Sequence, residues 1–200
     1  MDQLSKDYLI DFYTSRLMLH GDRPEALRWT PSGQVARYEA ISQLSGSIQG
    51  KRVLDYGCGK GDLYAYWLTK DIRPMYTGLD ITPELIELAR LKYPECDFMV
   101  HDIEEEPLES KFALGFVCGV FNNRVEGTTE SLKNSIRLLF DNVTEGLAIN
   151  AISSLSRDRD IDINYVDPED LLLYTRENIT SNAQLRLDLV EGDIFLFLYK

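Results

Sequence analysis

The chain has 200 residues, of which 44% are hydrophobic and 27% are charged, proportions ordinary for a globular domain with a sizeable core. Its formal net charge of −12 argues against a nucleic-acid partner, because binding to phosphates relies on clustered Lys and Arg. No apolar run is long enough to cross a membrane, and no basic-apolar leader stands at the start. We therefore expect a cytoplasmic protein with no membrane partner.

The first fifty residues read as a helical cap. Apolar residues at helical spacing predict one helix over residues 4–20 and another over 34–44, with loops at 20–24 and 29–33. The residues expected to lie near one face of the first helix are Leu4, Tyr8, Phe12 or Tyr13, and Leu17.

From residue 51 onward, short apolar runs alternate with helical patterns. The strands expected in this part lie at 52–56, 75–80, 97–101, 112–118 and 147–152, and the helices at 62–70, after Thr82-Pro83, at 128–140 and after Asp167-Pro168. Residues 184–190 and 194–199 then form a hairpin around a turn at 191–193. Repeated strand-helix units imply a doubly wound, mostly parallel α/β sheet, to which the hairpin adds one antiparallel strand.

The segment 52–62 is the most informative part of the sequence. It reads as a short strand ending in Asp55, a loop with glycines at alternate positions, and the start of a helix. The glycines are Gly57, Gly59 and Gly61. Such a loop is where open α/β sheets bind nucleotide-like ligands. Asp62 stands where a dinucleotide-binding motif has its third glycine, and a pyrophosphate beside Asp55 and Asp62 is disfavoured by charge repulsion.

Two further strands also end in acids. Asp80 closes the second strand, at the distance from the glycine loop where a ribose-binding acid is expected. Asp102 follows the third strand. Acids along one sheet edge disfavour a phosphate ligand and suit S-adenosylmethionine, which carries a sulfonium, an ammonium and ribose hydroxyls but no phosphate. The alternative function is that of an NAD-dependent oxidoreductase, and these acids argue against it.

These motifs resemble those of the class I, Rossmann-like methyltransferases that use S-adenosylmethionine. Segment 55–61 is similar to the first motif of that family, 79–81 to its ribose motif, 101–103 to its adenine motif and 113–121 to its fourth strand. The resemblance implies a seven-stranded sheet, with S-adenosylhomocysteine as the product. The cofactor-binding residues it implies are Asp55, Gly57, Cys58, Gly59, Gly61, Asp80, Ile81, Asp102, Ile103, Cys118 and Gly119.

The acceptor side of the site is less defined. In the geometry of that family the pocket lies under the N-terminal cap and beside the segments after the fourth and fifth strands. The candidate substrate-contacting residues are Tyr13, Arg16, Trp29, Gln34, Arg37, Phe121 and Arg124. His20 is a candidate general base or a helix-end residue, and Asn122 a candidate for orienting substrate or a turn residue.

No metal is expected, because Cys58, Cys96 and Cys118 have no metal-ligand spacing and the acid-lysine pattern of metal-dependent members is absent.

We expect one methyltransferase domain over residues 1–200, with a cap at 1–50 and a cofactor-binding core at 51–200. It should methylate oxygen or nitrogen of a small molecule, as a monomer or homodimer. A non-catalytic partner protein that binds S-adenosylmethionine, and an enzyme that methylates protein or RNA, stay open as alternatives.

Overall fold

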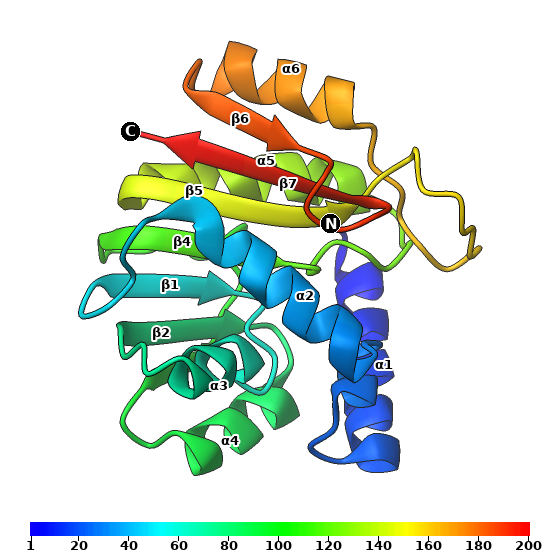
Figure 1. The fold of residues 1–200 in the computed structure, drawn as a ribbon. Coiled ribbons are helices and arrows are strands. Elements are labelled where there is room, and N and C mark those ends of the chain that lie inside the picture. Colours follow the sequence, from blue (N-terminus) through cyan, green and yellow to red (C-terminus); the bar gives the residue numbers. More distant parts are fainter.

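A computed structural model describes residues 1–200 as a single sheet of seven strands with helices on both faces (Figure 1). The strand order is β3-β2-β1-β4-β5-β7-β6, and only β7 runs antiparallel to its neighbours. The strands are β1 (Arg52–Tyr56), β2 (Met75–Asp80), β3 (Asp97–Val100), β4 (Phe112–Cys118), β5 (Val143–Ile152), β6 (Ala183–Arg186) and β7 (Asp193–Tyr199). This topology confirms the predicted fold class.

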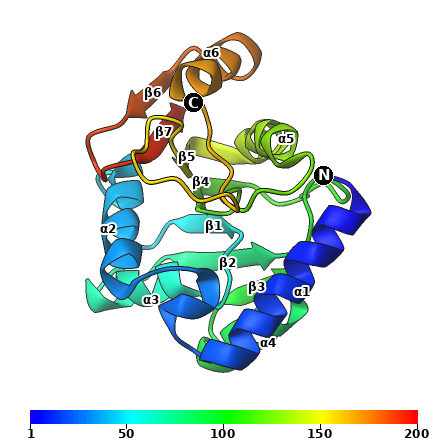
Figure 2. The same cartoon turned by 90° about the vertical axis from the view of Figure 1, so that its right-hand side faces the viewer.

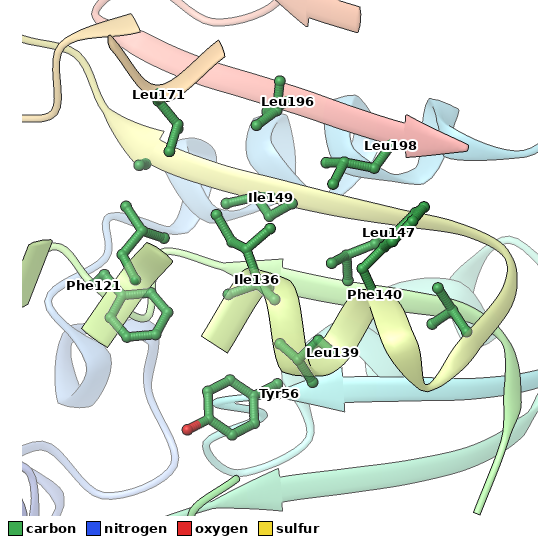
Figure 3. Packing of buried hydrophobic residues seen from close by; sticks show 14 of the residues in the cluster. Tyr56, Phe121, Ile136, Leu139, Phe140, Leu147, Ile149, Leu171, Leu196 and Leu198 are labelled. Atoms are coloured by element: carbon green, nitrogen blue, oxygen red, sulfur yellow. The ribbon is translucent and has the colours of Figure 1, made fainter. Parts of the chain in front are cut away.

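Alternation along the strands divides the core into two layers. The α-helices are α1 (Gln3–His20), α2 (Pro31–Ile41), α3 (Asp62–Thr69), α4 (Pro83–Lys92), α5 (Thr128–Asp141) and α6 (Pro168–Asn178). Two 3-10 turns cover Pro24–Leu27 and Ser42–Leu44. Leu54, Leu147 and Leu196 belong to one buried cluster with residues of α5 and α6. Figure 3 shows Leu147 and Leu196 beside Ile136 of α5 and Leu171 of α6. The neighbouring Val53 and Ala148 pack on the other face with α2, α3 and α4, because successive strand residues point to opposite faces.

Several element boundaries differ from the sequence prediction, and three of them are marked by local contacts. Helix α2 begins at Pro31 rather than residue 34, because Thr30 caps it by accepting a hydrogen bond from the Gly33 backbone N–H. Strand β5 begins at Val143, which pairs with Phe112 before a register shift. Strand β6 ends at Arg186, whose guanidinium folds back onto Asp188.

Helix α1 lies across the carboxyl ends of the parallel strands (Figure 2). Leu4 and Tyr8, which were expected to share one face of this helix with Phe12 or Tyr13 and Leu17, are 78% and 57% exposed. Tyr13 does point inward, together with Lys6 and Leu9, at the i, i+3, i+7 spacing of one helix face. The prediction was wrong for Leu4 and Tyr8 because a lysine occupies the buried face and breaks the apolar pattern. No helix in this chain combines the length and apolar character needed to cross a bilayer.

Helix α2 is tied to the sheet by a bidentate ion pair. The Arg37 Nε and Nη2 donate to the two carboxylate oxygens of Asp193, at 2.6 and 2.8 Å. The Asp193 side chain is only 2% exposed, and Asn150 Nδ2 donates to it at 2.9 Å. Arg37 also lies over the Trp29 ring, 4.8 Å from its centroid. The pair therefore holds the start of β7, helix α2 and the Trp29 loop together.

We predict that Arg37→Gln lowers the free energy of unfolding by about 3 kcal/mol, because it leaves the buried Asp193 carboxylate without its cation. Urea denaturation followed by circular dichroism measures this. Arg73→Gln is the matched control: it breaks an ion pair whose side chains are 64% and 93% exposed, so we expect a loss below about 1 kcal/mol. Equal losses in the two variants would contradict a structural role for the Arg37 pair.

Candidate cofactor and acceptor site

The loop between β1 and α3 brings its backbone close to neighbouring segments. Gly57 and Gly59 have φ values of 73° and 55°, a region that favours glycine. A Cβ atom at Gly57 would lie 2.3 Å from a methyl carbon of Val120. The N–H groups of Gly57 and Cys58 both donate to the carbonyl of Leu79, which fixes the loop against the end of β2. At Gly57, glycine is therefore needed both for the positive φ and because a side chain would collide with Val120.

Asp80 is the acid at the end of β2. Its two carboxylate oxygens accept backbone N–H bonds from Gly59 and Thr82, each at 2.9 Å. Burial raises the pKa of Asp80, although these backbone donors act in the opposite direction. One acid thus joins the glycine loop to the start of α4 while its carboxylate lines the cavity described below.

Asp55, at the end of β1, is 3% exposed. The Tyr76 hydroxyl donates to it. Burial raises the pKa of Asp55 to about 7, and the nearby charges of Asp80 and Asp62 push it in the same direction. The ligand-free site therefore holds a carboxyl group whose ionised form is unstable, and a neighbouring positive charge would stabilise that form.

These acids border one cavity, which has about 990 Å³ of space between its lining atoms, including its open mouth. Of its 24 lining residues, 14 are hydrophobic. The predicted site residues that line it are Tyr13, Trp29, Asp55, Gly57, Cys58, Gly59, Asp80, Ile81, Asp102, Cys118, Gly119 and Phe121. Most of the predicted cofactor residues are thus gathered in one place, under α1.

Helix α1 adds lining residues that the sequence analysis missed. Lys6 Nζ forms ion pairs with Asp102 and Glu105, both at 2.6 Å, so it reaches the acid expected to bind adenine. Leu9 lines the cavity beside it, and Glu104 accepts a hydrogen bond from Ser131 at the same end. The i, i+3, i+7 spacing of Lys6, Leu9 and Tyr13 was the available signal, but it is weak when one of the three residues is charged.

Several predicted site residues do not line the cavity and have other partners. Gln34 Nε2 donates to Asp62 at 3.0 Å, and Arg37 is paired with Asp193. Arg16 donates to the backbone carbonyl of Glu25. The others outside the lining are His20 at the end of α1, Gly61 at the start of α3, Ile103 in the core, the buried Asn122 behind Gly119, and the exposed Arg124.

Asp62 also differs from its expected role. The ammonium groups of Lys60 and Lys92 pair with its carboxylate, and both also pair with Asp22. Its charge is therefore compensated, and the repulsion expected for a phosphate at this site comes from Asp55 and Asp80. The network joins the loop after α1 to the start of α3 and the end of α4.

The arrangement suits a ligand that carries positive charge and hydroxyl groups next to an apolar part. Asp55 and Asp80 can accept hydrogen bonds from ammonium and hydroxyl groups, while Ile81 and Leu85 offer apolar surface between Asp80 and Asp102. No group of three His, Cys, Asp or Glu side chains is placed to hold a metal ion.

Comparisons with known proteins find methyltransferases. Residues 53–142 match the methyltransferase domain family. Demethylmenaquinone methyltransferase from Chlorobaculum tepidum is 33% identical over 100 residues, which cover 48% of this chain and 40% of the relative. Ubiquinone biosynthesis O-methyltransferase from Shewanella halifaxensis is 31% identical over 131 residues, covering 62% and 45%. The matched part of this chain thus spans less than half of each of these relatives.

Solved structures share the fold over the whole length. Magnesium protoporphyrin IX methyltransferase from Synechocystis PCC 6803, with bound S-adenosylmethionine, has a TM-score of 0.69 at 16% identity and covers 100% of this chain and 98% of its own. DhpI in complex with S-adenosylmethionine and a ligand abbreviated HEP has a TM-score of 0.71 at 13% identity, covering 98% of both chains. Residues 53–142 thus match the methyltransferase domain family, and the whole chain shares the fold of these solved methyltransferases.

Proposed function

We propose that this chain transfers a methyl group from S-adenosylmethionine to an oxygen or nitrogen atom of a small-molecule acceptor. The observation that carries the proposal is the convergence of Asp55, Asp80 and Asp102, from the ends of three parallel strands, on one largely apolar cavity. That set of groups fits a cationic nucleoside without phosphates and opposes a pyrophosphate. It therefore favours this cofactor over NAD.

In this proposal each part of the cofactor has its own residues. Asp55 and the loop 57–61 face the methionine part, and the Asp55 carboxylate stabilises the ammonium group. Asp80 accepts the ribose hydroxyls. Asp102, held by Lys6, lies at the adenine end. Residues 118–121 lie at the end of β4 and line the methyl-transfer side. The acids are already positioned by backbone and side-chain donors, which limits the reorganisation needed on binding.

A small acceptor is favoured because α1 and Leu27 border the cavity from outside the sheet. The chain's net charge opposes nucleic acid as the acceptor. The names of the curated relatives, which specify demethylmenaquinone and ubiquinone biosynthesis, support a small-molecule acceptor.

The cofactor supplies the electrophilic methyl group, and the chain supplies alignment and exclusion of water. Neither His20, the candidate base, nor Asn122, the candidate for orienting substrate, lines the cavity. We therefore propose that the acceptor is already nucleophilic near neutral pH, as an ionised oxygen or a neutral amine.

We predict that Asp80→Ala weakens binding of S-adenosylhomocysteine by at least about tenfold, because charge-assisted hydrogen bonds each contribute about 1.5–3 kcal/mol. Isothermal titration calorimetry measures the affinity. Asp188→Ala, which removes an exposed acid that does not line the cavity, is the control and should leave this affinity unchanged.

A folded wild-type protein that binds NADH but not S-adenosylhomocysteine would exclude the proposed function. Binding without methyl transfer to any of a panel of phenols, carboxylates and amines would favour a non-catalytic partner protein.

Asp55 gives the site a pH dependence with a defined sign. Its pKa is about 7 in the folded chain, against 3.8 as the ordinary value. Between these pH values the folded chain retains a proton that the unfolded chain has lost, so this group makes stability fall as pH rises through that window. Asp55→Asn removes the effect and keeps an acceptor for Tyr76.

We therefore predict that, without ligand, Asp55→Asn raises the melting temperature by a few degrees at pH 8 and leaves it nearly unchanged at pH 4. The same substitution should weaken binding of S-adenosylhomocysteine at pH 8. Wild-type affinity should decline as pH falls from 8 to 6, whereas the affinity of the variant should be flat. Scanning fluorimetry and calorimetry at several pH values test both. A lower melting temperature of the variant at pH 8 would contradict the raised pKa.

A further inference from the structure

The hydroxyl group of Tyr13 has an unusual environment. Tyr13 projects from α1 into the cavity, and its oxygen accepts a hydrogen bond from Asn123 Nδ2 at 2.9 Å. The hydroxyl donates no hydrogen bond to any group of the protein. A buried donor without an acceptor is costly, so a free O–H directed at a ligand cavity calls for an explanation.

The orientation of the Asn123 amide is fixed by a third residue. Arg28 Nη1 donates to Asn123 Oδ1 at 3.0 Å, and Arg28 Nη2 donates to Asp160 at 3.1 Å. A guanidinium can only donate hydrogen bonds, so the oxygen of the amide must face Arg28 and its NH₂ group must face Tyr13. Asn123 is 6% exposed, and its backbone carbonyl accepts a bond from Thr128, which leaves the side chain little freedom.

The polarity of this chain of hydrogen bonds determines where the Tyr13 proton points. Because the phenol oxygen accepts from Asn123, its own O–H has to be directed elsewhere, and the remaining open direction is the cavity. Burial raises the pKa of Tyr13 to about 12, so the group keeps its proton at physiological pH. The cavity is otherwise bordered by carboxylates, and its lysine, Lys6, is already paired.

Asp80 lines the same cavity as Tyr13, close enough for its charge to act on the phenol. The two side chains are complementary: Asp80 accepts hydrogen bonds and Tyr13 donates one. A ribose hydroxyl can donate to a carboxylate and accept from a phenol at the same time. A hydroxyl group of this kind can therefore form hydrogen bonds with both side chains.

We propose that Tyr13 is a cofactor-binding residue, that its O–H donates to a ribose oxygen of S-adenosylmethionine, and that Asn123 and Arg28 are positioning residues that set the direction of this bond. This inference rests on the proposed placement of the ribose at Asp80. It moves Tyr13 from the acceptor side, where the sequence analysis put it, to the cofactor.

Two substitutions test the bond without changing the volume of the site. Tyr13→Phe removes the donor. Asn123→Asp reverses the polarity: the carboxylate accepts from both Arg28 and Tyr13, so the phenol proton turns away from the cavity. Tyr8→Phe is the matched control, because Tyr8 lies on the exposed face of the same helix. Thermal unfolding establishes that all three variants are folded.

The measurement is the dissociation constant of S-adenosylhomocysteine and, separately, of 5′-methylthioadenosine, which retains the ribose but lacks the amino-acid part. We expect Tyr13→Phe and Asn123→Asp to weaken both ligands about two- to tenfold, the range for one neutral hydrogen bond, and Tyr8→Phe to weaken neither. A loss for S-adenosylhomocysteine alone would place the bond on the carboxylate and overturn the ribose assignment. Unchanged affinities for both ligands would overturn the inference, whereas a wild-type protein that binds neither would instead exclude the proposed function.

Discussion

The site depends on holding several carboxylates around one cavity of low polarity. Asp80 is stabilised by two backbone N–H groups, Asp55 by the Tyr76 hydroxyl, and Asp102 by Lys6. Each of these donors comes from a different element, so the sheet edge, the glycine loop and α1 must all be in place before the acids can be close together. The raised pKa of Asp55 indicates that the compensation is incomplete until a positively charged ligand arrives.

The cap is attached to the core by polar contacts as well as by the apolar face of α2, where Tyr38 and Ile41 join the core. Arg37 joins α2 to Asp193, and the lysine pair around Asp62 joins the loop after α1 to α3 and α4. These side chains are charged and buried or half-buried. From sequence alone, such residues are easily assigned to a ligand site. In this protein their partners are other residues of the chain. Buried pairing of this kind maintains the geometry, because separating the two partners would leave a buried charge without compensation.

The sequence was sufficient to predict the sheet and the glycine loop after β1, because period-two and helical patterns are local and a glycine at position 57 suits the positive φ found there. It also located Asp80 and Asp102, since strand ends in a parallel sheet share one edge. It could not predict that Gln34 and Arg37 turn away from the cavity, nor that Lys6 enters it. Those outcomes depend on partners distant in sequence, such as Asp193, and no local pattern encodes them.

The placement of α1 also has a consequence for the order of folding. Its inward residues meet groups that follow much later in the chain: Lys6 pairs with Glu105, and Tyr13 meets Asn123 at a separation of 110 residues. During synthesis this helix emerges before its binding surface exists, and its Leu4 and Met18 stay exposed even in the folded state. Its docking therefore belongs to the late, non-local steps of folding, after β4 has joined the sheet. Until then the inward residues of the newly made segment, Leu9 and Tyr13 among them, stay exposed to solvent.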